Sequence, residues 1–526
     1  MSKLFQIMNY QKYFKKEALI RLLLLLLLIG VPNIFSFLIL NEKRVTVLIN
    51  NLFLISLSIL LLKPSFTKII GYFLLCIFVI NNGLEIFSLY FYKSSFNVGM
   101  ALNLLSSNVR ESFEMSRGYW LVFLIAICYY VLICISVNSI RKYVSSKILI
   151  FFCLLLIIYP MYLLHIEIDR NRNNTLYKKT GESDLYFYMG PTPINAFGPF
   201  LEAHHYIEIV KQTSEEDFHY PPFTVQNNNI QNLVVVLGES ARRDALSLYG
   251  SQVNTTPFIQ KRITNLLIYN NAISPGEFTN LALCLILSKQ IPENNFSIEK
   301  NNDNLVSLAN ATNVWKTYWV SNQEKTGLYV NLFANIDLKS KYKYWTKPGS
   351  YDEAIFPFID NILKDTTKKR LIFIHLMGSH AAAGMRYPNT FSKFHSEVVG
   401  FKNEYNNSIA YTDFILDNII KKMEGSSSIV LYLSDHGQTI EDGAYRHSLT
   451  KKGVDVPFFI WYSDSVENKY KKLGQINNYI SATNLYNIVE DLMGIQGLTP
   501  KNLNDSLKTM DGSMKPSFYK DLKPGS

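Results

Sequence analysis

The sequence predicts two unlike parts: an α-helical membrane domain with five spans, and an exported α/β domain with a mostly parallel sheet flanked by helices. Three observations support this division. Long apolar runs fill the chain before residue 166, basic residues are unevenly distributed between them, and apolar strands alternate with helical stretches after Asn232. We expect a transmembrane domain at 1–165, a linker at 166–229 and a folded exported domain at 230–526.

Each apolar run approaches the ~20 residues that cross a bilayer core of ~30 Å. A cleaved signal peptide would account for one run, not for five. The shortest run also fits a buried helix or a re-entrant segment. The five runs are Ala18–Leu40, Thr46–Leu62, Ile69–Phe91, Tyr119–Val137 and Lys147–Leu164.

Basic residues predict the orientation of these spans. They gather before the first span and in the loops after the second and fourth spans, whereas the opposite loops carry fewer for their length. The positive-inside rule therefore places the amino terminus in the cytoplasm and everything after about His165 on the outer side. The net charge of +10 is spread along the chain and partly serves this topology, so we find no signature of nucleic-acid binding.

The segment from His165 to about Asn229 is polar and contains several prolines, which is typical of a linker. Within it, 200–210 has the pattern of an interfacial helix, whose His204 and His205 we interpret as surface residues. Cys284 is the only cysteine of the exported part, so that part can form no internal disulfide.

A candidate metal site follows one of the predicted strands. The apolar run Ile429–Leu433 leads directly into Asp435 and His436. Ligands bind at the carboxyl ends of strands in open α/β sheets, and adjacent oxygen and nitrogen donors there suit a divalent metal such as zinc. The alternative is a polar turn without a ligand.

A second strand, Leu233–Leu237, delivers Glu239 in the same way and predicts a third metal ligand. We expect a helix to begin near Ser240, so Glu239 or Ser240 could instead cap that helix. Ser240 could also be the nucleophile of a serine hydrolase, but the second glycine of that motif is missing.

The third strand, Leu371–Ile374, runs into two histidines. His380, which follows a glycine, is the better candidate for the same sheet edge, whereas His375 at the strand end fits a packed structural residue. Downstream, His447 lies on a loop that could return to the metal as a phosphate or acid/base partner. Taken alone, His447 also fits a surface residue.

Together these motifs resemble a known family. The motifs are Gly238-Glu-Ser-Ala-Arg242, His375-x-x-Gly-Ser-His380 with Arg386-Tyr387-Pro388, and Ser434-Asp-His-Gly437. In order and spacing they are similar to the phosphoethanolamine transferases of Gram-negative inner membranes, in the alkaline phosphatase/sulfatase superfamily. The five-span anchor is similar too, so the resemblance covers nearly the whole chain. It implies an inner-membrane enzyme with a periplasmic catalytic domain.

The resemblance also implies roles for individual residues. Thr279 falls on the position of the family's zinc-bound nucleophile, and metal coordination lowers the pKa of a hydroxyl. Alternatively Thr279 caps the expected helix Leu281–Leu287. The roles of helix cap and nucleophile can coexist. The resemblance implies one zinc ion, with a second possible, and assigns the residues as follows: metal ligands Glu239, Thr279, Asp435 and His436; phosphoryl contacts His380, His447 and Lys325.

One set of residues bears on the donor substrate. Asn103, Ser107 and Glu111 have i, i+4 spacing and share one helical face. The resemblance implies that such a face binds the ethanolamine head group, with Glu111 holding the ammonium; an ordinary interfacial helix is the alternative.

The chain also departs from the family. Pro275 replaces the first cysteine of a disulfide that many members have in the nucleophile loop, so Cys284 has no partner. The sulfatase branch has a Cys or Ser followed two residues later by Pro and then Arg. The residues after Thr279 do not fit that pattern, which argues against a sulfatase.

The expected reaction is transfer of phosphoethanolamine from phosphatidylethanolamine to lipopolysaccharide, on a core sugar or lipid A, through a phosphoethanolamine-threonine intermediate. Two alternatives remain: a glycerol-phosphate transferase of the same superfamily, which also has five spans and a threonine nucleophile, and a non-catalytic scaffold for envelope assembly. The sequence leaves the acceptor, the number of metals and the oligomeric state open.

Overall fold

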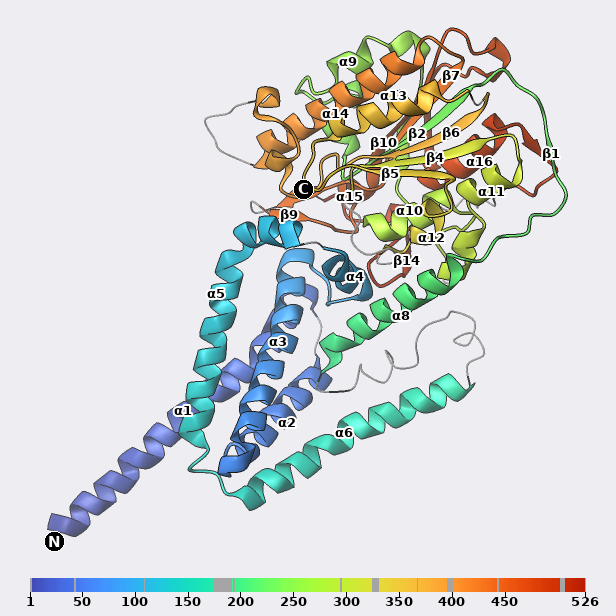
Figure 1. Ribbon diagram of the computed structural model, residues 1–526. Coiled ribbons are helices and arrows are strands. Elements are labelled where there is room, and N and C mark those ends of the chain that lie inside the picture. Colours follow the sequence, from blue (N-terminus) through green and yellow to red (C-terminus); the bar gives the residue numbers. More distant parts are fainter. Residues whose placement is uncertain are drawn as a thin grey trace. The chain divides into compact units, whose positions relative to one another are not determined.

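The chain divides into two compact units in the computed structural model (Figure 1). One unit contains Met1–Asn97 and Ser116–Glu202, and the other contains Val98–Met115 and Ala203–Ser526. The structure describes residues 2–41, 44–107, 109–173, 192, 194–293, 296–323, 331–366, 368–394, 401–441, 444–501 and 507–525.

The first unit contains long apolar helices, as the sequence predicts. Four helices in the described part of the chain are long and apolar enough to cross a membrane, and the 17-residue α2 is shorter. The shortest apolar run therefore remains open to both interpretations, a membrane span or a buried or re-entrant helix. The helices are α1 (Ser2–Leu40), α2 (Val45–Leu61), α3 (Lys68–Tyr92), α5 (Val109–Ile140) and α6 (Ser146–Asn173).

Polar side chains connect the helices inside this apolar unit. Asn51 of α2 and Asn82 of α3 exchange two hydrogen bonds of 3.0 Å and are almost fully buried. Glu85, one turn after Asn82, pairs with Arg44 and accepts a hydrogen bond from the backbone N–H of Phe96 at 3.1 Å. In an apolar medium such groups need internal partners, so these contacts specify how α2 and α3 pack.

The second unit is built on an eight-stranded sheet with the order β11-β3-β10-β7-β2-β6-β4-β5. Only β10 runs against its neighbours, because it pairs antiparallel with both β3 and β7 while the other pairs are parallel. The prediction of a mostly parallel sheet is therefore confirmed. The strands are β2 (Asn232–Gly238), β3 (Leu266–Ile273), β4 (Lys316–Ser321), β5 (Tyr342–Trp345), β6 (Arg370–His375), β7 (Ser428–Ser434), β10 (Asp455–Tyr462) and β11 (Gly474–Ser481).

Helices cover both faces of this sheet (Figure 1). On one face, Val234 and Val236 of β2 belong to the same buried cluster as Ile359 of α13 and Ile415 of α14. The intervening side chains of β2 face the other layer, because successive side chains of a strand alternate. The helices are α9 (Pro257–Gln260), α13 (Phe356–Lys364) and α14 (Phe401–Met423) on the first face, and α10 (Thr279–Leu287), α11 (Leu305–Ala311) and α16 (Leu485–Leu492) on the second.

Several local expectations are confirmed and one is wrong. The helix expected at 200–210 corresponds to α8 (Gly198–Thr213), whose interfacial position stays a prediction, and the expected helix after the nucleophile loop corresponds to α10. No α-helix begins near Ser240, however. The described chain there forms two short 3₁₀ turns, Arg243–Ala245 and Ser247–Tyr249. The backbone N–H groups of 240–242 donate to side chains of Asp435, Ser434 and Tyr405, which lie far along the chain.

Candidate active site

Strand register brings the first two candidate ligands together. β2 and β7 are fully buried and pair in parallel, with Gly238 opposite Ser434. The next residue of each strand, Glu239 and Asp435, therefore emerges at the same carboxyl edge of the sheet. The backbone N–H of Asp435 donates to the carbonyl of Gly238 at 3.0 Å, which fixes the two ends against each other.

His436 completes a buried cluster with these carboxylates. Its Nε2 lies 3.4 Å from Glu239 Oε1 and 3.4 Å from Asp435 Oδ2. Its Nδ1 lies 3.0 Å from the carbonyl oxygen of Gly437. Because a carbonyl only accepts hydrogen bonds, Nδ1 carries the proton, and the lone pair of Nε2 faces the carboxylates.

The cluster fits a zinc ion. Zinc lies about 2.0–2.2 Å from oxygen and nitrogen ligands, so neighbouring donors of a tetrahedron are roughly 3.3–3.6 Å apart; the two spacings from His436 Nε2 agree with this. Asp435 Oδ2 is buried and has no hydrogen-bond partner in the part of the chain that the structure describes. A buried carboxylate oxygen without a partner is costly unless a cation is bound beside it.

The raised carboxyl pKa values also favour a bound cation. Burial and the neighbouring Asp435 together raise the pKa of Glu239 to about 7, although His436 lowers it. Burial likewise raises the pKa of Asp435 to about 6. Two buried carboxylates side by side resist ionisation, and a divalent cation would offset that repulsion.

Thr279 contacts this cluster from the start of α10. Its Oγ1 donates to Glu239 Oε2 at 2.9 Å and lies 3.2 Å from His436 Nε2. Thr279 is half-buried, whereas the three ligand candidates are at most 1% exposed. The N-cap of α10 is Phe278, without a side-chain hydrogen bond, so the Thr279 hydroxyl points to the cluster and does not cap the helix.

Ser240 has a supporting position and not a catalytic one. It is fully buried, and its hydroxyl donates to Glu239 Oε1 at 2.6 Å. Its backbone has φ 58°, which costs a residue with a side chain about 1–2 kcal/mol. Its N–H donates to Asp435 Oδ1 at 3.1 Å. A buried hydroxyl held in this way cannot act as the nucleophile of a serine hydrolase, and no helix follows that it could cap.

Two more candidate histidines lie near the cluster. The His447 ring is 4.7 Å from the ring of His436, centroid to centroid. Burial and the neighbouring histidines hold the pKa of His447 well below its usual range. His380 is close enough to interact electrostatically with both Glu239 and His447. The neutral form of His447 can accept a proton.

His375 has the packed position expected for it. It is 2% exposed and its ring lies edge-on to Trp319 and Phe333. Burial lowers the pKa of His375 to about 3, so this imidazole is neutral over the physiological range.

Of the four predicted substrate-binding residues, the structure describes two. Asn103 lies in α4 (Val98–Ser106), and both the N–H and the hydroxyl of Ser107 donate to its carbonyl, at 3.0 and 2.7 Å. Both residues belong to the same unit as the cluster. Lys325 and the side chain of Glu111 fall outside the described residues.

Sequence reasoning missed two polar side chains that support the site. Gln323 donates to the carbonyl of Leu376 at 2.8 Å and approaches Glu239 Oε2 at 3.5 Å. Asp352 is 1% exposed and accepts hydrogen bonds from the backbone N–H groups of Met377 and Gly378 at 2.8 and 3.0 Å. Neither residue has a signal in the sequence, because each acts through loops that are distant along the chain.

The chain is similar to known proteins in sequence. The family described as Sulfatase matches residues 231–495, half of the chain. The phosphoethanolamine transferase EptC of Escherichia coli O18:K1:H7 is 24% identical over 447 residues, covering 77% of this chain and 76% of its own. YhbX of Escherichia coli K12 is 28% identical over 283 residues, so the chain spans about half the length of that relative.

Solved structures share the fold. The integral membrane lipooligosaccharide phosphoethanolamine transferase EptA of Neisseria meningitidis matches 90% of this chain and 95% of its own, with a TM-score of 0.62 and 18% identity. The periplasmic domain of Escherichia coli EptC in complex with zinc matches 58% of this chain and 98% of its own, with a TM-score of 0.51 and 22% identity. The predicted two-part architecture is thereby confirmed.

Proposed function

Because this chain belongs to the sulfatase family and its relatives include phosphoethanolamine transferases, we propose that it transfers phosphoethanolamine from phosphatidylethanolamine to lipopolysaccharide. The observation that carries the proposal is the position of the Thr279 hydroxyl, within hydrogen-bond distance of both Glu239 and His436. A half-buried hydroxyl held against buried metal-ligand types is the arrangement of an activated nucleophile.

Glu239, Thr279, Asp435 and His436 would hold the zinc ion. When bound, zinc lowers the pKa of the threonine hydroxyl and offsets charge on the phosphoryl group. The periplasmic domain of Escherichia coli EptC, solved in complex with zinc, supports this choice of metal. The N-terminus of α10 adds backbone N–H groups and a partial positive charge beside the phosphate.

The first step forms the bond between Thr279 Oγ1 and phosphorus and breaks the bond from phosphorus to the glycerol oxygen. Diacylglycerol leaves with a proton, and the threonine carries phosphoethanolamine. In the second step an acceptor hydroxyl attacks phosphorus and the bond to Thr279 Oγ1 breaks; His447 or His380 takes the acceptor proton, and a proton returns to Thr279 Oγ1 to restore the hydroxyl. Burial lowers the pKa of His447, so its imidazole is neutral and can accept a hydrogen bond from the acceptor group.

The proposed substrates require a membrane location. Phosphatidylethanolamine is a lipid, and four helices among the described residues are long and apolar enough to cross a bilayer. We infer an inner-membrane protein with a cytoplasmic amino terminus and a periplasmic catalytic domain. Within the other unit, Asn103 of α4, Ser107 directly after that helix and Glu111 would contact the ethanolamine head group, and Lys325 would contact the phosphoryl oxygens.

Mass spectrometry of lipopolysaccharide tests the proposal. Cells with the protein should carry more phosphoethanolamine on lipid A or core than cells without it or cells with Thr279→Ala. Trapped enzyme should show phosphoethanolamine on the peptide that contains Thr279. An unchanged content in all three strains would contradict the proposed acceptor and donor.

A further inference from the structure

The C-terminal hairpin, Lys508–Phe518, contacts the loop that presents the candidate nucleophile. It consists of β13 (Lys508–Met510) and β14 (Pro516–Phe518), paired antiparallel. Its sequence is polar and weakly patterned, yet Met510 is fully buried. None of its residues enters the reaction proposed above, so its burial needs another explanation.

The hairpin extends strand-like pairing onto the nucleophile loop, Ser274–Phe278. Met510 donates its N–H to the carbonyl of Pro275 at 2.8 Å and accepts from the N–H of Glu277 at 3.2 Å. Gly276 and Met510 form an isolated parallel bridge. Backbone pairing on both sides of Gly276 fixes the path of the loop two residues before Thr279.

A carboxyl group strengthens this contact. Glu277 Oε1 accepts the N–H of Gly512 at 2.6 Å, and burial, with Asp511 nearby, raises the pKa of Glu277 to about 8. The backbone of Glu277 is also hydrogen-bonded to His447. Glu277 therefore connects the hairpin to two groups of the proposed reaction, His447 through its backbone and Thr279 through two peptide units.

The same hairpin residue reaches α4. The N–H of Gly99, in the first turn of that helix, donates to the carbonyl of Gly512 at 2.8 Å. A Cβ atom at Gly99 would lie 2.9 Å from Gly512 Cα and 2.9 Å from Phe278 Cε1. The helix, the hairpin and the nucleophile loop thus meet at closest possible approach, which only glycine permits.

No covalent link replaces these contacts. All five cysteines are free, and Cys284 of α10 is buried and accepts a hydrogen bond from Asn301. The loop is held by Ser274, whose N–H donates to the carbonyl of Val454 at 2.8 Å, and by the hairpin.

We propose that the C-terminal hairpin is a non-covalent clamp on the nucleophile loop, with Glu277 and Gly512 as positioning residues that fix Thr279 relative to α4. The catalytic consequence of the clamp rests on the proposed function. Its structural consequence does not, because the clamp predicts that a change at α4 or at Glu277 loosens the nucleophile loop.

Hydrogen–deuterium exchange of the full-length protein in detergent measures the structural consequence of the clamp separately from its catalytic consequence. Glu277→Ala removes the acceptor of Gly512 N–H, whereas Glu277→Gln keeps a carbonyl oxygen there. We expect about tenfold faster exchange in peptides that cover Gly276–Asn280 and Met510–Gly512 for the alanine variant, and near wild-type exchange for the glutamine variant. The matched control is Lys515→Ala, an exposed hairpin side chain that leaves these contacts intact.

Gly99→Ala tests the link to α4. We expect faster exchange at Gly276–Asn280 although the substitution lies in a distant part of the sequence. Exchange that changes only within α4, or that is equal in Glu277→Ala and Lys515→Ala, would overturn the clamp.

Turnover provides the second readout. With a phosphatidylethanolamine donor, Glu277→Ala should lower kcat by roughly 10- to 100-fold, since small misplacement of a nucleophile has that effect. Glu277→Gln should recover most of the loss, and zinc content should stay unchanged. If wild-type protein transfers no phosphoethanolamine, the proposed function fails, while the exchange data still decide the clamp.

Discussion

The hydroxyl of Thr279 donates a hydrogen bond to Glu239 Oε2 at 2.9 Å, although the two residues lie 40 positions apart in the chain. One follows β2 and the other begins α10. Their meeting places a half-buried hydroxyl against a fully buried carboxylate. The proposed reaction uses that contact, and the first prediction tests it.

Replacing Thr279 by alanine should lower kcat for phosphoethanolamine transfer by roughly 10³-fold or more, because no covalent intermediate can form. Thr279→Ser keeps a hydroxyl and should retain measurable turnover. Donor cleavage by purified protein in detergent is the assay, and zinc content by elemental analysis is the control. Wild-type turnover in Thr279→Ala would show that another group attacks phosphorus.

Removing the metal should abolish turnover, and zinc should restore it. Asp435→Asn should weaken zinc binding by about 100-fold or more, since loss of even an outer partner costs 10–100-fold. The expected reason is that Asp435 Oδ2 is buried without another partner. Competition with a chelator measures the affinity. Equal zinc retention by the wild type and this variant would remove Asp435 from the metal site.

Asp352 is expected to position the turn that leads to His380. Its carboxylate accepts from Met377 and Gly378, so Asp352→Asn should cost about 1–3 kcal/mol of unfolding free energy and lower kcat. The matched control is Asp360→Asn, in the following helix, which loses only an exposed ion pair with Lys422. A double-mutant cycle with His380→Ala should be non-additive. Strict additivity would mean that Asp352 acts on folding alone.

His375 should make the second unit sensitive to acid. Its pKa is about 3 in the folded chain and about 6.5 in the unfolded chain. Between these values the unfolded chain binds more protons, so stability is fully present above pH ~6.5 and falls as pH drops toward ~3. His375→Phe should flatten this part of the pH–stability curve, measured by tryptophan fluorescence during thermal unfolding. An unchanged slope would assign the acid sensitivity to other groups.

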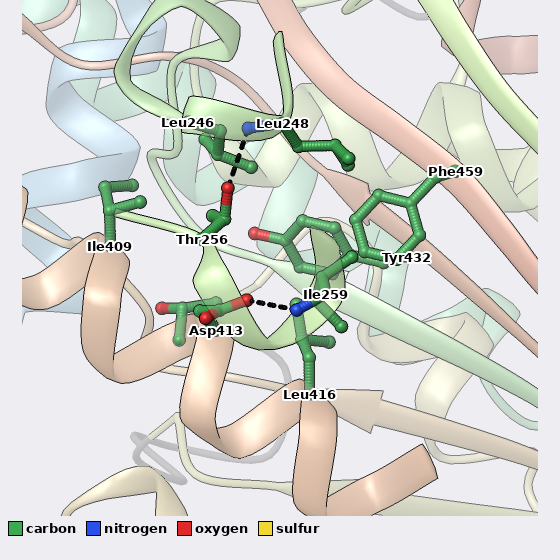
Figure 2. A pocket seen from close by; sticks show the side chains of 10 residues that line it. Leu246, Leu248, Thr256, Ile259, Ile409, Asp413, Leu416, Tyr432 and Phe459 are labelled. Carbon is green, nitrogen blue, oxygen red and sulfur yellow. Dashed lines mark hydrogen bonds between the residues drawn. The ribbon is translucent and has the colours of Figure 1, made fainter. Parts of the chain in front are cut away.

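Asp413 stabilises a helix start beside a small cavity of the core (Figure 2). The figure shows its carboxylate against the N-terminus of α9, where it accepts from Phe258 and Ile259 at 2.8 and 3.0 Å. Leu246, Tyr432 and Phe459 also line this cavity. Asp413→Ala should cost about 1–3 kcal/mol of unfolding free energy, because two backbone donors lose their acceptor. Asp413→Asn should cost less, and kcat should stay unchanged in both variants.

The fold and much of the site could be predicted because the strongest signals are local. Apolar runs gave the membrane helices, and Leu233–Leu237 and Ile429–Leu433 read as buried strands whose ends carry Glu239 and Asp435. Parallel pairing alone then brings these carboxylates to one edge, as the register of β2 and β7 shows.

What could not be predicted depends on contacts between distant segments. The segment after Ser240 is not an α-helix, because its polar groups bond to Asp435, Ser434 and Tyr405, which are far along the chain. The reversed direction of β10 has no local signal. Neither does Met510, whose burial depends on Pro275 and Glu277 as partners.

The reversed strand β10 has an evolutionary consequence. The start of β10, not its end, lies beside the site: in the residues that directly precede it, the carbonyl of Gly453 accepts from Gly437, and that of Val454 accepts from Ser274. The chain between Gly437 and Gly453 therefore leaves and returns at the same edge of the sheet. Its length can change without moving Asp435 or the register of the strands. An insertion between Glu441 and Ala444, where β8 (Thr439–Glu441) and β9 (Ala444–Arg446) turn, would change the surroundings of the site while both ends of the segment stay in place.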